Sequence, residues 1–130
     1  MVYGREDEDW NDLTRVGLGF LVERAKLGRP TSYTELNTTL TQRTGLRPFD
    51  FSRADERAAM GHLLGLIVER SFPLTGLMIS ALVMYLGEND AGSGFYVLAT
   101  DLGLLPARAS EDEKFDFWIG QVNGLYAHYG

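Results

Sequence analysis

The sequence predicts an α+β protein that is mostly helical, with about five helices and a very small sheet. Three observations support this class. Apolar residues recur at intervals of three and four along several segments. A serine followed three residues later by an acidic residue precedes three of these segments, as at helix N-termini. One continuous apolar run, residues 77–86, lacks polar alternation and is typical of a strand covered on both faces.

Length and composition favour one soluble globular domain over residues 1–130, with a core at 31–95 and a C-terminal helix at 110–129. The chain is 45% hydrophobic and 23% charged and contains no cysteine, which excludes disulfides and thiol catalysis and fits a cytoplasmic protein. Residues 1–12 are acidic, so we expect no signal peptide. The longest apolar run is too short for a membrane span, so we expect no membrane association.

The first helix is expected from about Asp9 to Leu27. Acidic residues precede it at the positive end of its dipole, and Gly28 and Pro30 end it. Its predicted buried face contains Trp10, Leu13, Gly17, Phe20 and Leu21.

The second and third helices are each expected to begin with a capping box. Ser32 with Glu35 begins the second, which Gly45 ends, and its buried residues are Tyr33, Leu36 and Leu40. Ser52 with Asp55 begins the third, which continues to about Arg70 with Met60, Leu63, Leu64, Ile67 and Val68 on one face. Pro73 and Gly76 then predict a turn.

Residues 77–86 are predicted to form a buried strand, with a buried helix as the alternative. A short helix is expected from Phe95 to Leu102, ended by Gly103 and Pro106. Ser110 with Glu113 forms a third capping box before the last helix. The apolar face of that helix is predicted to contain Phe115, Trp118, Val122, Leu125, Tyr126 and Tyr129.

The order of helix, helix, buried strand and glycine-rich loop over residues 31–95 is that of a winged-helix domain. The segments Ser32-Tyr33-Thr34-Glu35-Leu36, Ala59-Met60-Gly61 and Gly92-Ser93-Gly94-Phe95 carry a closer resemblance. Together with the apolar run, they resemble the winged-helix domain of alkylguanine-DNA alkyltransferases and alkyltransferase-like proteins. They are also similar to small domains that accompany bacterial HNH-type endonucleases. The resemblance covers about half of the chain and implies a winged-helix fold with a DNA-facing surface.

The alkyltransferase active site is not part of this resemblance. Those enzymes have Pro-Cys-His-Arg at the strand, where this chain has Ile79-Ser80-Ala81-Leu82, and their base-displacing arginine would fall at Ala58, with Arg57 one residue out of register. His62 and His128 lack neighbours at metal-ligand spacing. Turn geometry explains residues 88–90 (Glu-Asn-Asp) better than a calcium loop does. We therefore expect a non-catalytic protein with no cofactor and no bound metal.

The charge distribution is uneven along a chain of net charge −6. Residues 15–57 contain more basic than acidic side chains, whereas the remainder is strongly acidic. Nucleic-acid phosphates are expected to contact Arg43, Arg47, Arg53 and Arg57, weakly and without sequence preference. The exposed side of the third helix lacks the Arg, Lys, Asn and Gln side chains that read bases. The alternative is that the basic residues form ordinary solvated helix faces.

Glycines inside two predicted helices form a second candidate site. A glycine costs about 1 kcal/mol relative to alanine within a helix, so several on one face call for a reason. They either allow close packing inside the monomer or form smooth faces that dock onto a second chain. The predicted interface residues are Ala58, Gly61, His62, Gly65, Gly120 and Gly124.

Two functional hypotheses follow. The leading one is a non-catalytic, winged-helix-like module that acts in a nucleic-acid context. The alternative is an acidic protein-interaction module, either a homodimer or bound to a different protein, without direct nucleic-acid binding. A continuous positive face around residues 43–57 favours the first, and an apolar or glycine-lined face favours the second.

Overall fold

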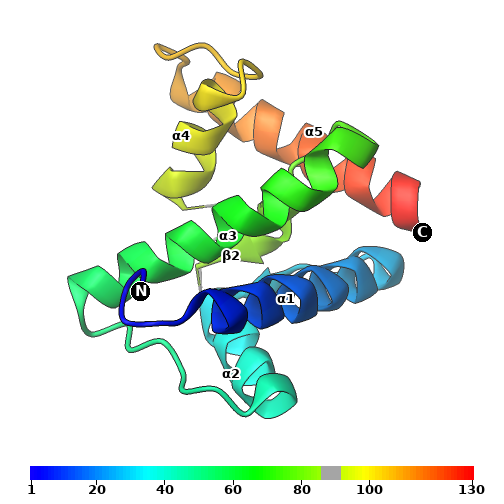
Figure 1. The fold of residues 1–130 in the computed structure, drawn as a ribbon. Coiled ribbons are helices and arrows are strands. Elements are labelled where there is room, and N and C mark those ends of the chain that lie inside the picture. The colour runs from blue at the N-terminus through cyan, green and yellow to red at the C-terminus, as the bar shows by residue number, and fades with distance from the viewer. Residues whose placement is uncertain (86–91) are drawn as a thin grey trace.

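The computed structural model describes residues 1–85 and 92–130 (Figure 1). In these residues the chain forms, in order, α1 (Asp7–Leu27), β1 (Thr31–Ser32), α2 (Tyr33–Thr44), α3 (Ala54–Thr75), η1 (Ile79–Leu82), β2 (Val83–Met84), α4 (Ser93–Asp101) and α5 (Glu111–Tyr129). A mostly helical protein with a very small sheet is thereby confirmed. The winged-helix identity stays a prediction.

The core lies where α1 packs against α2, α3, η1 and α5. All five residues predicted on the buried face of α1 are buried. One of them, Gly17, is required by a close approach, because a Cβ atom there would lie 2.8 Å from the Cδ1 atom of Ile67. α1 begins two residues before the predicted Asp9 and ends at Gly28 as predicted, and Gly28 adopts the left-handed conformation.

The predicted capping box of α2 forms only in part. The backbone N–H of Glu35 donates to the Ser32 hydroxyl over 3.0 Å, as expected. The Glu35 carboxylate does not return to the Ser32 backbone; it accepts from the Thr31 hydroxyl at 2.6 Å and pairs with Arg24 at 2.7 Å. Leu36 and Leu40 are buried and Tyr33 is half-buried.

The start and end of α3 differ from the prediction, although its predicted buried face is correct. The second capping box is wrong, because the Ser52 hydroxyl donates to Asp50 at 2.6 Å and Arg53 takes the N-cap position. The turn predicted at Pro73 is also wrong, since α3 continues through it to Thr75. A proline in the last turn removes a single helical hydrogen bond, and Gly76 ends the helix in the left-handed conformation.

The predicted strand over residues 77–86 is wrong for most of its described part, residues 77–85, and the alternative α-helix does not form there either. This part includes the 3-10 helix η1 followed by the two-residue β2, and Met78 to Val83 are buried. Side chains of α5 satisfy its backbone groups: Met78 N–H donates to Gln121 Oε1 at 2.8 Å, and Trp118 Nε1 donates to the Ala81 carbonyl at 2.8 Å. Because these partners come from a helix, the segment is not extended along a sheet.

The sheet consists of β1 paired in parallel with β2, with Thr31 opposite Val83 and Ser32 opposite Met84. The glycine-rich wing predicted to end at Phe95 is wrong in its described part, because α4 begins at Ser93. Residues 86–91, which include the Glu-Asn-Asp turn, lie outside the described residues. α5 begins with the complete capping box predicted at Ser110 and Glu113, but Phe115 is exposed rather than part of an apolar core face.

α4 is attached to the rest of the protein through few side chains. Phe95 and Ala99 are its buried residues, and the Phe95 ring lies 5.8 Å from that of Phe117 in α5. In Figure 1, α1 and α2 lie on one side of α3 and α4 lies on the other. α4 approaches α3 less closely than α1 and η1 do, which leaves room between α3 and α4.

Candidate binding groove between α3 and α4

Two of the arginines predicted to contact phosphate form bidentate pairs with carboxylates of the same chain. Arg43 at the end of α2 donates to both carboxylate oxygens of Glu23 in α1, at 2.7 and 3.0 Å. Arg53 donates to both oxygens of Asp55, at 3.0 and 2.8 Å. The hydrogen bonds from these guanidinium groups lower the pKa of Glu23 and of Asp55. Both positive charges are thus already compensated within the monomer.

The other two arginines also have intramolecular partners. Arg47 donates to Glu56 Oε1 at 2.9 Å, and Glu56 is only 6% exposed, so Arg47 neutralises a buried carboxylate. Arg57 donates to the Phe51 carbonyl at 2.7 Å. Each of the four arginines therefore has an intramolecular partner of its own, and their contact with phosphate stays a prediction.

The predicted interface residues fall into different environments. His62 is half-buried, with its ring 4.8 Å from Trp10 and 5.8 Å from Tyr3, so it belongs to an aromatic cluster with the N-terminal segment. Gly124 is half-buried too, and a Cβ atom there would lie 3.1 Å from the Cδ2 atom of Leu77. The remaining four, Ala58, Gly61, Gly65 and Gly120, are exposed or half-buried, and a Cβ atom at any of the three glycines would meet nothing within 4 Å.

Gly61 and Gly65 lie in the wall of a groove between α3 and α4, which we call the α3–α4 groove. It consists of two hollows of about 330 Å³ each that share Gly65 and Leu98. The inner hollow is lined by Tyr33, Gly61, Leu64, Gly65, Ser80, Ser93, Gly94, Phe95, Val97, Leu98 and Asp101. The outer hollow is lined by Gly65, Val68, Glu69, Phe72, Pro73, Leu98 and Leu102. The groove therefore follows α3 from Gly61 to Pro73.

The walls of the groove are mainly apolar and partly open to solvent. Val97 is 61% exposed and Leu102 is 37% exposed, although both are large apolar residues. The two glycines on α3 expose backbone rather than side chains, so an approaching surface would meet no obstruction there. Contiguous apolar surface of this kind is characteristic of binding sites.

Two acidic side chains stand at the groove, Glu69 on α3 and Asp101 on α4, and both are exposed. Neither forms an ion pair with the described residues, in contrast to the carboxylates that pair with Arg43, Arg47 and Arg53. No lysine, arginine or histidine lines either hollow within the described residues. The groove therefore combines an apolar surface with an uncompensated negative charge.

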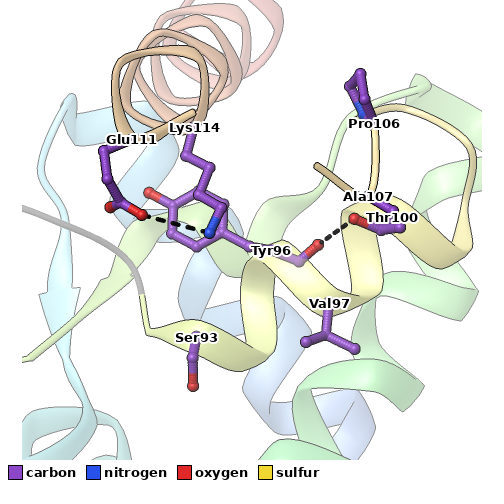
Figure 2. A pocket seen from close by; sticks show the side chains of 8 residues that line it. All are labelled: Ser93, Tyr96, Val97, Thr100, Pro106, Ala107, Glu111 and Lys114. Atoms are coloured by element: carbon purple, nitrogen blue, oxygen red, sulfur yellow. Dashed lines mark hydrogen bonds and ion pairs between the residues drawn. The ribbon is translucent and has the colours of Figure 1, made fainter. Parts of the chain in front are cut away.

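A separate hollow of about 420 Å³ lies between α4 and the start of α5 (Figure 2). Figure 2 shows Glu111 and Lys114 beside the ring of Tyr96. Lys114 Nζ is 3.5 Å from Glu111 and 5.8 Å from the centre of the Tyr96 ring. Because its charged groups are paired with each other, this hollow has less binding potential than the α3–α4 groove.

Two further properties of the described residues bear on the expected function. No helix among them is long and apolar enough to cross a membrane. In the same residues, no three histidine, aspartate or glutamate side chains are placed to hold a metal ion.

The sequence indicated part of this groove but not its whole composition. Gly61 and Gly65 were among the predicted interface residues and line one wall, whereas Ser80 was not predicted, although it is the single polar residue between Leu77 and Met84. The opposite wall was not predictable, because it depends on where α4 lies relative to α3.

Comparisons of the chain with protein-family models, curated proteins and solved structures give no match.

Proposed function

We propose that this protein is a non-catalytic interaction module whose α3–α4 groove binds an amphipathic helical segment of a partner protein, with basic residues beside its apolar face. The observation that carries the proposal is the combination of exposed apolar side chains and unpaired carboxylates along one groove. It is favoured over nucleic-acid binding because the predicted phosphate-binding arginines already have partners.

The dimensions of the groove suit a short helix. Twelve residue steps separate Gly61 from Pro73, which at the helical rise corresponds to about 18 Å, or roughly three turns. An amphipathic helix lays side chains spaced three and four apart into such an apolar groove. The exposed backbone at Gly61 and Gly65 would allow these side chains to approach α3 closely.

The negative charge of the groove determines which residues are favoured beside the apolar face of the partner helix. Glu69 and Asp101 favour lysine or arginine on the partner and disfavour acidic residues. The net charge of −6 acts in the same direction, because it attracts basic partners over a longer range and opposes self-association through this surface. The occupant is therefore expected to be a different protein rather than a second copy of this chain.

Binding of two designed peptides tests the proposal. One is an amphipathic helix of about four turns with leucine on one face and lysine elsewhere, and the other has glutamate in place of every lysine. We expect the leucine–lysine peptide to bind in a fluorescence anisotropy titration and the leucine–glutamate peptide not to bind. Equal affinity for the two peptides, or no binding of either, would contradict the proposed charge preference.

Two matched variants locate the binding site. Gly65→Lys places a long cation in the groove, whereas Gly19→Lys makes the same change at an exposed, unobstructed position of α1. Both should fold, because lysine is a better helix former than glycine. We expect Gly65→Lys to lower the affinity for the leucine–lysine peptide by about tenfold or more, which corresponds to about 1.4 kcal/mol of binding free energy. Gly19→Lys should have little effect on this affinity. Equal weakening by the two variants would refute binding in the groove.

A further inference from the structure

We propose that the inner hollow of the groove is an anchor pocket for one large aromatic side chain of the partner helix, with tryptophan preferred over phenylalanine. The inference rests on the proposed docking function and narrows the class of partner. The partner would be a basic amphipathic helix with an aromatic residue on its apolar face. The outer hollow does not share this preference for an aromatic side chain.

The inner hollow is the more enclosed end of the groove. Its lining residues come from four elements, α2, α3, η1 and α4, whereas those of the outer hollow come from α3, α4 and the C-cap of α4. Leu64 and Phe95, which line the inner hollow, are only 8% and 5% exposed and belong to the hydrophobic core. A side chain that enters the hollow is therefore placed against core residues. Well-packed, desolvated pockets of this kind hold the side chains that contribute most to binding.

The volume of the inner hollow suits an aromatic ring system better than an aliphatic side chain. The volume is about 330 Å³, roughly twice that of a 150 Å³ cavity that holds benzene. A leucine side chain is smaller than benzene, so it would leave most of this space empty and the lining atoms would lose dispersion contacts. The indole of tryptophan has a second ring fused to a benzene ring and fills the space best.

Two aromatic residues line the inner hollow, Phe95 from α4 and Tyr33 from α2. Both already make edge-to-face contacts, with Tyr96 at 5.2 Å and with Phe51 at 6.5 Å between ring centres, respectively. A ring that enters the hollow can make the same kind of contact, which stabilises aromatic pairs beyond the burial of their area. The outer hollow has Phe72 as its single aromatic lining residue. The lining thus favours an aromatic side chain in the inner hollow.

Glycine backbone leaves the inner hollow accessible to a side chain of a docked helix. Gly61 and Gly65 on α3 and Gly94 on α4 line it, and a Cβ atom at any of the three would meet nothing within 4 Å. A large ring therefore meets no side chain from these positions as it enters. A buried indole N–H normally needs an acceptor, and the exposed Asp101, which also lines the hollow, offers a carboxylate.

Tryptophan scanning of the leucine–lysine peptide tests the inference. Each leucine is replaced in turn by tryptophan, and affinity is measured from the anisotropy of a fluorescent label on the peptide, because the protein itself contains Trp10 and Trp118. We expect tryptophan at one position to raise the affinity by about tenfold over leucine. At that position phenylalanine should give a smaller gain and alanine a loss.

The outer hollow supplies a control within the same peptide. The centres of the two hollows are about six residues apart along α3, which corresponds to about 9 Å. The leucine roughly two turns from the best tryptophan position therefore faces the outer hollow. Tryptophan at this second position should raise the affinity by less than about twofold, because fewer elements enclose its ring.

Gly61→Leu and Gly120→Leu form a matched pair of protein variants. Both glycines are exposed in a helix and a Cβ atom at either would meet nothing within 4 Å, but only Gly61 lines the inner hollow. Both variants should fold, because leucine is a better helix former than glycine. Gly61→Leu adds an apolar side chain at the hollow and should reduce the gain from tryptophan to less than about twofold, whereas Gly120→Leu should preserve the gain.

The possible results separate the anchor pocket from the docking function. If the all-leucine peptide binds and tryptophan gives no gain at any position, the anchor pocket is overturned and the docking function stands. If neither the all-leucine peptide nor any tryptophan peptide binds, both are overturned. A gain from tryptophan that survives Gly61→Leu would place the aromatic side chain outside the inner hollow and overturn its assignment there.

Discussion

Alanine substitutions at Gly65 and Gly17 should have different effects on stability, because only one of these helical glycines is required by packing. A Cβ atom at Gly65 would meet nothing within 4 Å, so Gly65→Ala should gain the full difference in helix propensity, about 1 kcal/mol. A Cβ atom at Gly17 would lie 2.8 Å from the Cδ1 atom of Ile67, and Ile67 is fully buried and has little room to move. Overpacking costs about 1–3 kcal/mol, so Gly17→Ala should be neutral or destabilised by up to about 2 kcal/mol after the propensity gain.

These free energies convert into measurable melting temperatures. The unfolding entropy of a chain of 130 residues is about 270 cal/mol/K, so 1 kcal/mol corresponds to about 4 °C. Differential scanning calorimetry should therefore place Gly65→Ala about 4 °C above the wild type and between about 4 and 12 °C above Gly17→Ala. Urea denaturation gives an independent estimate of the same difference. Equal stability of the two variants, or destabilisation by Gly65→Ala, would refute the conclusion that the groove glycines have no packing role.

Three other substitutions and titrations test particular interactions. The protein should not bind a labelled DNA duplex with micromolar affinity at low salt, because Arg43 and Arg53 are already paired with carboxylates. Strongly salt-dependent binding that Arg43→Ala abolishes would restore the nucleic-acid hypothesis. Ser110→Ala should lower the free energy of unfolding by about 1 kcal/mol, whereas Ser52→Ala should lower it by less, because Ser52 does not cap a helix. Urea denaturation that finds the larger loss for Ser52→Ala would contradict this. Burial raises the pKa of Tyr33 to about 12, so between pH 10 and about 12 the folded state retains a proton that the unfolded state loses, and the free energy of unfolding falls as the pH rises. Tyr33→Phe should make this fall shallower, and an unchanged dependence of the free energy of unfolding on pH would argue against the raised pKa.

The sequence predicted well where local periodicity and local caps determine the structure. The buried faces of α1 and α3 were correct because apolar residues at helical spacing can be buried in only one way. The capping box at Ser110 was correct because both of its hydrogen bonds join residues only three apart in the sequence, Ser110 and Glu113. At Ser52 the same pattern was misleading, since Asp50 accepts the serine hydroxyl and the preceding turn is stabilised instead.

The errors occurred where partners distant in sequence decide the conformation. Residues 77–86 were predicted as a strand from their apolar character, but in the described part of this run Gln121 and Trp118 supply hydrogen bonds that a strand would obtain from its neighbours. The candidate site shows the same limit. The excess of basic residues in 15–57 was visible in the sequence, yet the pairing of Arg43 with Glu23 and of Arg47 with Glu56 depends on helix packing. The groove itself depends on the position of α4, which no local pattern encodes.

Chemical-shift mapping of the bound leucine–lysine peptide tests the central claim most directly. The backbone amides of the ¹⁵N-labelled protein report which surface the peptide contacts, without any substitution in the chain. Docking in the α3–α4 groove predicts the largest saturable shifts at Gly65, Leu98 and Leu102, with small changes at Arg43 and Arg53. Shifts centred on Arg43 and Arg53, or shifts spread evenly over the acidic surface, would contradict it.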